Sequence, residues 1–152
     1  MSLPIELWGS NIWCLFHGLS CKINEDKFLY HKDRLIYIIK SICSTLPCPE
    51  CSNDATAILN TFNFNTIKNK EDFKVFLFNF HNIINKKLKK PLYEYSNLDI
   101  YNNINMNALY TNFKLIYLTK INNPRLMGIS LNKKILYPKI MEALLLVKND
   151  LQ

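Results

Sequence analysis

The sequence predicts an all-α protein built as a four-helix bundle with a short fifth helix and a helical C-terminal extension. In many windows apolar residues recur every three or four positions, which is the period of an amphipathic helix. The chain holds only three glycines and few runs that alternate apolar and polar residues, which argues against a β-sandwich or barrel. With 152 residues, 49% of them hydrophobic, it has the apolar content for one compact core.

The first two helices are predicted over residues 5–20 and between Asn24 and Pro47. Trp13 and His17 lie one turn apart in the first helix and therefore share a face. Asn24 can cap the second helix, and Pro47 is expected to end it. The apolar residues at helical spacing are Trp8, Ile12, Leu15, Phe16 and Leu19 in the first, and Phe28, Leu35, Ile39, Ile42 and Leu46 in the second.

The third and fourth helices complete the predicted up-down bundle. The third is expected to begin at Cys48 or Pro49, because proline is well tolerated at a first helical position, and to run to about Leu59. Residues 60–69 are rich in asparagine and predict a loop. The fourth helix is expected to end before Pro91. Its apolar stripe is Phe73, Phe76, Leu77, Phe80, Ile84 and Leu88.

The remaining residues predict shorter helices. Ser96 is expected to cap a fifth helix that reaches about Met106. Apolar periodicity over 109–118 and 140–147 predicts two more helices, separated by Asn122-Asn123-Pro124 and a turn at Gly128. We therefore expect one domain over residues 1–107, with residues 108–152 as a helical extension packed on it.

Charge and hydropathy limit the classes of partner. The formal net charge of +7 is almost wholly lysine, and the resulting basic surface suits nucleic acid, an anionic cofactor or acidic client proteins. No segment has the ~20 uninterrupted apolar residues that a membrane span needs. The N-terminus lacks a basic-then-apolar signal sequence. These features predict a cytoplasmic protein without a membrane anchor.

Two of the five cysteines, Cys48 and Cys51, are separated by Pro49-Glu50 at the start of a predicted helix. Such a pair can form an accessible disulfide, and the helix dipole lowers the pKa of a thiol there, so the pair can cycle between disulfide and dithiol. The alternatives are a zinc half-site or two buried core cysteines. The three histidines are scattered, so no metal site is expected. A thioredoxin-like fold would require βαβ units, which the helical pattern does not offer.

The sequence leaves the roles of the other three cysteines open, and Cys14 and Cys21 are expected not to pair unless the first helix ends near Gly18. Cys14 and Cys21 are seven residues apart, which on a continuous helix separates their Cα atoms by ~10 Å, too far for a disulfide. Cys43 is either a core residue or a resolving thiol, and we favour the core because cysteine is often a small buried hydrophobe.

Net disulfide formation needs an electron acceptor, and two helices offer residues that could hold one. Trp13 and His17 supply flat rings, and His81, Asn82 and Asn85 supply a further ring and amides, which suit stacking and edge hydrogen bonds to a flat heterocycle. Lys86, Lys87, Lys89 and Lys90 follow and could neutralise a pyrophosphate. Taken singly, each residue also has a structural explanation: core aromatic, satisfied core histidine, or solvated helix end.

Together these motifs resemble the FAD-linked sulfhydryl oxidases of the Erv/ALR family, and the chain looks most like their compact viral members. The resemblance covers about residues 5–105, in the same order and with similar spacings. It is carried by Trp13-x-x-x-His17, by residues 46–51 (LPCPEC) and by residues 80–91 (FHNIINKKLKKP), the most specific part.

The resemblance implies FAD as the cofactor, held at one end of a bundle that usually pairs as a homodimer. A substrate thiolate would attack Cys48, and Cys51 would pass electrons to FAD and then to oxygen, with hydrogen peroxide produced. Carried over by position, the residues that would contact FAD are Trp8, Trp13, His17, His81, Asn82, Asn85, Lys87 and Lys90.

The sequence departs from the family pattern at two points, and both limit the range of substrate proteins that we expect. Residues 93–95 lack the cysteine that forms a structural bridge in cellular members, and no second CxxC flanks the core. The expected substrate is therefore a protein dithiol on a dedicated partner, thioredoxin-like or viral, in a host cytoplasm or a virion. The alternative is a basic helical module that binds nucleic acid or another partner, with structural cysteines, although nucleic acid is not the expected ligand. A third is a flavin-free thiol exchanger.

Overall fold

The computed structural model describes residues 5–118 and 127–152, and these form helices joined by short connections. Within these ranges there is no β-strand, which confirms the predicted all-α class. The helices are α1 (Ile5–Lys22), η1 (Glu25–Lys27), α2 (Phe28–Cys43), α3 (Pro49–Leu59), η2 (Phe64–Thr66), α4 (Lys70–Lys87), η3 (Tyr95–Asn103), α5 (Met106–Tyr117) and α6 (Met127–Lys148), where η denotes a 3-10 helix.

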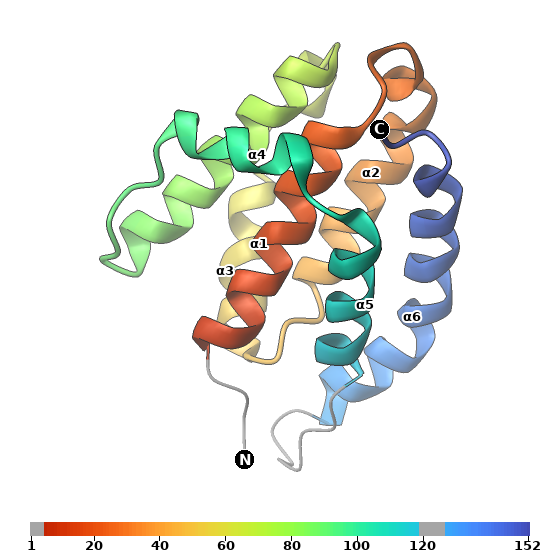
Figure 1. Cartoon of the computed structure of the whole chain (residues 1–152). Helices are drawn as coiled ribbons and strands as arrows, with labels where there is room; N and C mark the ends of the chain where they lie inside the picture. The colour runs from red at the N-terminus through yellow and green to blue at the C-terminus, as the bar shows by residue number, and fades with distance from the viewer. Residues whose placement is uncertain (1–4, 119–126) are drawn as a thin grey trace.

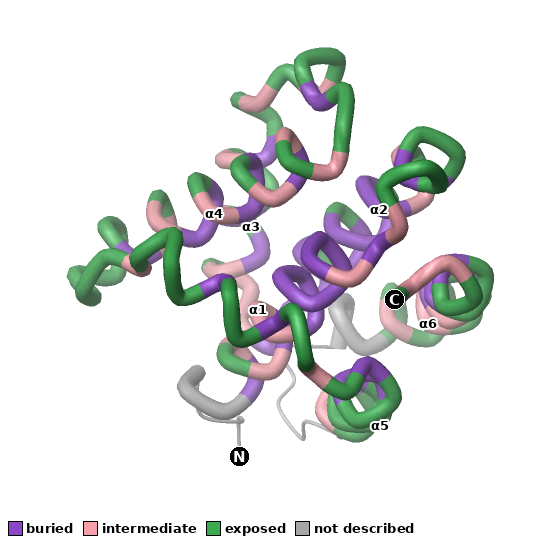
Figure 2. Tube along the Cα trace, turned by 45° about the horizontal axis from the view of Figure 1, so that its top comes forward, coloured by how far each residue is buried: buried purple, intermediate pink, exposed green. Residues whose placement is uncertain are grey.

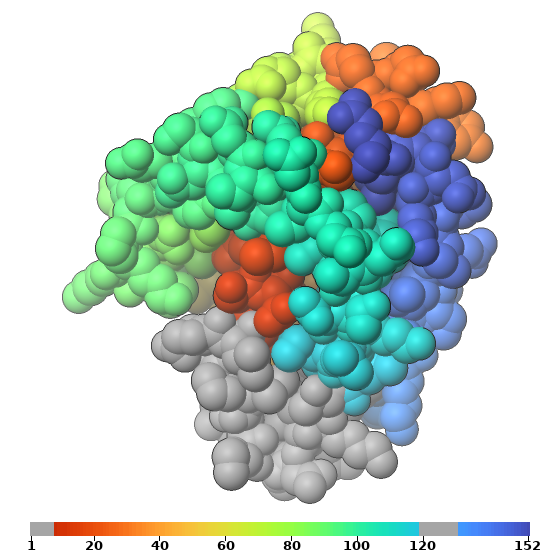
Figure 3. Space-filling view, viewed as in Figure 1, coloured from red at the N-terminus to blue at the C-terminus, as the bar shows by residue number. Residues whose placement is uncertain are grey.

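Helix α1 lies at the centre of the molecule (Figure 1). It contacts α4 and η3 on one side and α5 on the other, while α2 contacts α3 and α6. The buried segments face one another where these helices meet, and the outer faces of α5 and α6 are exposed (Figure 2). Large side chains that are almost fully buried fill this core, among them Phe16, Phe28, Phe73, Phe80 and Phe113. On the face drawn in Figure 3, α1 reaches the surface as a red patch between the green residues that precede η3 and the blue-green residues of α5.

The predicted second helix differs from the structure at both ends. Asn24 precedes the 3-10 turn η1 instead of α2, and its side chain makes no capping hydrogen bond. Helix α2 ends at Cys43, four residues before Pro47. The hydroxyls of Ser44 and Thr45 donate to the carbonyl of Ser41, at 2.8 and 2.9 Å. Such side-chain bonds compete with continuation of the helix, which explains the earlier end.

Asparagine side chains cap two of the described α-helices. The Oδ1 atom of Asn69 accepts from the backbone N–H of Asp72 at 2.8 Å at the start of α4, and Asn105 does the same for Ala108 at 3.2 Å in α5. Each side chain satisfies a backbone donor that the first helical turn leaves unpaired. Helix α4 ends at Lys87, before Pro91, as predicted.

The predicted short fifth helix is present, but the prediction that Ser96 caps it is wrong. The segment is the 3-10 helix η3, which begins at Tyr95 and whose cap position is Glu94. Leu98 and Tyr101, its two buried residues, lie three positions apart and pack with Cys21 of α1. A spacing of three brings side chains onto one face of a 3-10 helix, so this short segment buries one narrow stripe.

The two helices predicted beyond residue 108 are present as α5 and α6. The turn expected at Gly128 is wrong, because Gly128 lies inside α6, and Asn122-Asn123-Pro124 lies outside the described residues. None of the described helices combines the length and the hydrophobicity that a membrane span requires.

The end of the chain is tied to the junction between α1 and α2. The backbone N–H of Gln152 donates to the carbonyl of Lys22 at 2.7 Å, and that of Asn24 donates to Asp150 at 2.9 Å. His31, which is buried, lies between Arg34 and the carboxylate of Asp150, at 2.7 and 2.6 Å. Residues 149–152 therefore hold the C-terminal end of α6 against the core.

Close packing of α5 on α1 gives the first testable prediction. A Cβ atom added at Gly18 would lie 2.8 Å from the Cδ1 atom of Leu109 and 3.0 Å from the sulfur of Met106, both buried. Gly9, on the same helix, has no such neighbour within 4 Å. We expect Gly9→Ala to raise the free energy of unfolding by up to about 1 kcal/mol. Gly18→Ala should be less stable than Gly9→Ala by about 1–3 kcal/mol.

Urea unfolding of the two variants beside the wild type measures this difference. Equal stabilisation by both alanines would mean that α5 does not pack against Gly18 as described.

Candidate functional site

Cys48 and Cys51 form a disulfide at the N-terminus of α3, with their Cα atoms 5.1 Å apart. Cys48 is the cap residue of α3, in an extended conformation, and its sulfur accepts a hydrogen bond from the backbone N–H of Cys51 at 3.2 Å. Both cysteines are partly exposed. The positive end of the helix dipole stabilises negative charge on sulfur here, as a reactive thiolate requires.

A cavity of about 450 Å³ lies beside this disulfide, between α1, α3 and α4. Cys51 lines it and Cys48 does not. The volume is within the range of small-molecule and cofactor sites, which are mostly apolar with a few polar groups. Of the residues predicted to hold a cofactor, the cavity is lined by Trp8, Trp13, His81, Asn85, Lys87 and Lys90.

Aromatic rings from α1 and α4 stack at one wall of the cavity. The ring of Trp13 lies parallel to that of His81, with centroids 4.1 Å apart and an angle of 8° between the planes. Tyr93 stacks on His81 at 4.9 Å and on His17 at 5.4 Å. His17 does not line the cavity and lies behind this layer, fully buried. The rings of Trp13, His17 and His81, all predicted as site residues, therefore lie in one cluster.

Burial favours the neutral form of both histidines of the cluster at neutral pH. Burial, with the charge of His81 as a smaller cause, lowers the pKa of His17 from 6.5 to about 3. Burial, and then the charge of Lys90, lowers the pKa of His81 from 6.5 to about 4. The Nε2 atom of His17 lies 2.8 Å from the Nδ1 atom of His81, so one neutral ring donates and the other accepts. The Nδ1 atom of His17 is buried without a hydrogen-bond partner among the described residues.

The two asparagines hold the backbone that follows α4. The amide of Asn82 accepts from the backbone N–H of Tyr93 at 2.7 Å and donates to its carbonyl at 3.0 Å. Asn85 donates to the carbonyl of Pro91 at 3.3 Å. Asn82 does not line the cavity, whereas Asn85 does. Their amides place the ring of Tyr93 against the two histidines.

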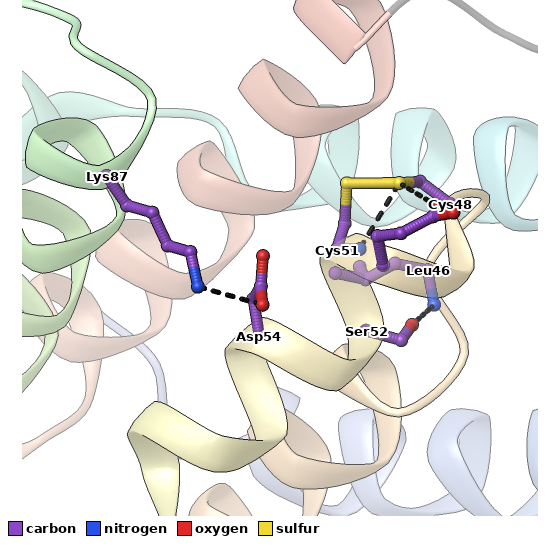
Figure 4. Close-up of a disulfide and its surroundings, with 7 residues drawn as sticks. Leu46, Cys48, Cys51, Ser52, Asp54 and Lys87 are labelled. Carbon is purple, nitrogen blue, oxygen red and sulfur yellow. Dashed lines mark hydrogen bonds and ion pairs between the residues drawn. A yellow bond between two sulfur atoms is a disulfide. The ribbon is translucent and has the colours of Figure 1, made fainter.

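Lys87 of α4 forms an ion pair with Asp54 of α3, the helix that begins at the disulfide. Its Nζ atom lies 2.8 Å from Asp54, which comes one turn after Cys51 on α3 (Figure 4). Both side chains are about half exposed, and both line the cavity. An exposed ion pair of this kind contributes little to stability, and its effect is to place one cation and one anion at the edge of the cavity.

The cavity also contains residues that the sequence analysis did not single out as site residues. Asp54 could have been found, because its spacing of three from Cys51 puts the two side chains on one helix face. Tyr93 comes from the irregular segment after Pro91, which carries no periodic signal, and Tyr101 comes from η3. The hydroxyl of Tyr101 donates to the sulfur of Cys14, another cavity residue, at 3.5 Å.

The other cysteines are thiols in the structure. Cys14, Cys21 and Cys43 form no disulfide, and Cys43 is buried in the core as expected. Burial raises the pKa of Cys43 far above its ordinary value and raises that of Cys21. Within the described ranges, no group of three or more His, Cys, Asp or Glu residues is placed to hold a metal ion.

The residues around the cavity fit a flat aromatic cofactor with an anionic part. Parallel rings and apolar side chains suit a planar heterocycle. In the adjoining ring cluster, the buried Nδ1 atom of His17 has no hydrogen-bond partner among the described residues. Lys87 and Lys90 bring positive charge to the same cavity. FAD has both parts.

Comparisons with known proteins agree with this arrangement. The protein "Putative FAD-linked sulfhydryl oxidase 096R" of Invertebrate iridescent virus 3 is 30% identical over 92 residues, which are 60% of this chain and 62% of that protein. An African swine fever virus protein named FAD-linked sulfhydryl oxidase is 33% identical over 89 residues, which are 59% of this chain and 74% of that protein. The chain thus spans less than two thirds of the iridescent virus relative. No solved structure matches the chain significantly.

A family model adds the broader relationship. The model described as the Erv1 / Alr family matches residues 10–104. That range contains the disulfide, the ring cluster and both cavity lysines. Because the match covers more than half of the 152 residues, the chain belongs to the Erv1 / Alr family.

Proposed function

We propose that the protein is an FAD-linked thiol oxidase that makes disulfide bonds in a protein substrate. The observation that carries this proposal is the position of Cys51, which is disulfide-bonded to a partly exposed Cys48 and lines a cavity that suits a flavin. The viral relatives named as FAD-linked sulfhydryl oxidases support the same activity.

The first half of the reaction is thiol–disulfide exchange at the N-terminus of α3. A substrate thiolate attacks the sulfur of Cys48, forming a mixed disulfide and releasing Cys51 as a thiolate that the helix dipole stabilises. A second substrate thiolate then attacks the substrate sulfur of the mixed disulfide. This step releases the substrate as a disulfide and leaves both cysteines reduced, so the pair gains two electrons.

The cavity residues have separate roles in this proposal. Trp8, Trp13 and His81 bind the flat part of the cofactor, and Lys87 and Lys90 pair with its phosphates. His17, Asn82 and Asn85 act behind them: Asn82 and Asn85 fix the segment that carries Tyr93, and His17 supports His81 through the 2.8 Å contact between their ring nitrogens. When bound, FAD supplies the acceptor that takes two electrons from the reduced pair and passes them to molecular oxygen, with hydrogen peroxide formed.

The partner in this proposal is a dithiol on a dedicated client protein, and the enzyme works as a homodimer in the host cytoplasm or the virion. The viral origin of the relatives supports this setting. In a cytosol, net disulfide formation runs against the reducing thiol pool, so a dedicated client fits better than general oxidation.

Replacing Trp13 tests whether the cavity holds the flavin. We expect the purified protein to be yellow, and Trp13→Ala to retain about 10- to 100-fold less cofactor, because it removes a large stacking surface next to His81. Trp13→Phe keeps a flat ring and should lie between the two. The measurement is visible absorbance after gel filtration, with thermal unfolding to confirm that each variant is folded.

A colourless wild-type protein would contradict the proposal. If the colourless protein also bound nucleic acid with a steep dependence on salt, the basic binding module would be the better explanation.

A further inference from the structure

The segment Thr45–Pro47 joins α2 to Cys48 and is buried throughout. Two hydrogen bonds from side chains of other elements hold it. The backbone N–H of Leu46 donates to the hydroxyl of Ser52 at 2.8 Å, which links the segment to α3 just after Cys51 (Figure 4). The hydroxyl of Thr45 lies 2.9 Å from the hydroxyl of Tyr117, which comes from the last turn of α5.

The direction of the second bond follows from the other partners of Thr45. Its single hydroxyl hydrogen points to the carbonyls of Ser41 and Ile42, at 2.9 and 3.2 Å. The oxygen of Thr45 can therefore accept from Tyr117, the direction in which both hydroxyl hydrogens are used. Burial raises the pKa of Tyr117, so the donor stays protonated at neutral pH. Both side chains are almost completely buried, with exposed fractions of 1% for Thr45 and 4% for Tyr117, so water does not replace this bond.

Helix α6 fixes Tyr117 from the opposite side. The ammonium group of Lys133 donates to the carbonyl of Tyr117 at 3.2 Å and lies 5.0 Å from the centre of its ring. The ring of Tyr137 stacks on that of Tyr117 at 5.9 Å. These three residues lie outside the range 10–104 that matches the Erv1 / Alr family.

We propose that Tyr117 is a positioning residue for the Cys48–Cys51 pair. Through Thr45 it holds the segment that carries Cys48, so that the sulfur of Cys48 stays within bonding reach of Cys51. In turnover this role rests on the proposed oxidase function. The effect on the cysteine pair itself exists without a cofactor.

The thermodynamic consequence concerns the balance between disulfide and dithiol. Reduction breaks the sulfur–sulfur bond, adds two electrons and two protons to the pair, and oxidises two thiols of the reductant to a disulfide. A segment that is held in place keeps the two thiols close after reduction and so favours closure of the disulfide. Releasing the segment lets Cys48 move away, which favours the dithiol.

A pair of matched variants tests this role. Tyr117→Phe removes the hydroxyl that holds Thr45. Tyr110→Phe removes a hydroxyl from the same helix that is equally buried and donates to the carbonyl of Leu144 at 2.8 Å, away from the disulfide. The full-length protein is equilibrated in the absence of oxygen with mixtures of reduced and oxidised dithiothreitol, and the dithiol fraction is read from the mass added by a thiol-alkylating reagent.

We expect Tyr117→Phe to shift the equilibrium toward the dithiol by up to about fivefold, the factor for one hydrogen bond that is made in the disulfide form and lost in the dithiol form. Tyr110→Phe should leave it at the wild-type value. An unchanged equilibrium in Tyr117→Phe, or equal shifts in both variants, would overturn the proposal.

Substitutions of Thr45 test the same hydrogen bond at its other partner. They provide the test if Tyr117→Phe does not fold. Thr45→Val removes the acceptor and should shift the equilibrium in the same direction. Thr45→Ser retains the hydroxyl and should stay near the wild type. If Thr45→Val matched the wild type, the contact would have no positioning role. Without oxygen the cysteine pair comes to equilibrium with dithiothreitol whether or not a flavin is bound, so a protein without oxidase activity could still pass or fail the test.

Discussion

Replacing Cys51 with serine should reduce oxidation of a model dithiol to the uncatalysed background while the protein keeps its flavin. Serine cannot form the disulfide with Cys48, so no pair remains to accept electrons from the substrate. The cavity that Cys51 lines is formed mainly by aromatic and apolar residues that the substitution leaves in place. The measurements are oxygen consumption with dithiothreitol as substrate and visible absorbance of the purified variant.

The matched control for this substitution is Cys21→Ser. Cys21 is buried between α1 and η3, outside the cavity, and forms no disulfide. We expect this variant to oxidise dithiols at a rate close to that of the wild type. Turnover that survived in Cys51→Ser would contradict the assignment of the redox pair, and turnover that was lost in both variants would point to a general loss of folding.

Acid should destabilise the fold through the buried histidine pair. His17 and His81 have lower pKa values in the fold, about 3 and about 4, than the 6.5 of an unperturbed histidine. Below pH 6.5 the unfolded chain therefore binds more protons than the folded one, so stability falls as pH falls from 6.5 toward 4. Between pH 6.5 and 4.5 the shift of His17 alone corresponds to about 3 kcal/mol. Urea unfolding between pH 7.5 and 4.5 measures this dependence.

The variant His17→Asn separates this contribution from general acid unfolding. It removes one of the two groups that take up protons on unfolding, so its free energy of unfolding should depend less on pH than that of the wild type over the same range. The test compares only how the free energy of unfolding changes with pH, so a different stability of the variant at pH 7.5 does not affect it. Parallel pH dependences in the two proteins would mean that His17 does not stay neutral in the fold.

Much of the fold could be predicted because the helices that form the core bury regular apolar stripes. The stripe from Phe73 to Ile84 placed α4 correctly, although Leu88 follows the helix and is exposed, and Pro49 marked the start of α3. The end of α2 could not be predicted from Pro47, because side-chain bonds from Ser44 and Thr45 to the backbone end the helix earlier. Gly128 likewise indicated a turn, yet a single glycine is tolerated inside a helix at a cost of about 1 kcal/mol.

The sequence predicts which residues belong to the site more fully than it predicts how their side chains are arranged. The spacing of Trp13 and His17 put them on one face, and the structure brings them together with His81. Which residues line the cavity depends on contacts between distant segments. Asn82 faces the backbone of Tyr93 instead of the cavity, because the irregular segment after Pro91 folds back on α4. Local periodicity carries no information about such a return.

The position of the tryptophans gives the protein a built-in optical reporter. The sequence contains two tryptophans, Trp8 and Trp13, and both line the cavity beside the disulfide. Their ultraviolet fluorescence therefore arises from this one place in the molecule. Quenching or a change in emission wavelength reports what happens in the cavity, and uptake of a ligand there can be followed in real time in the unlabelled protein.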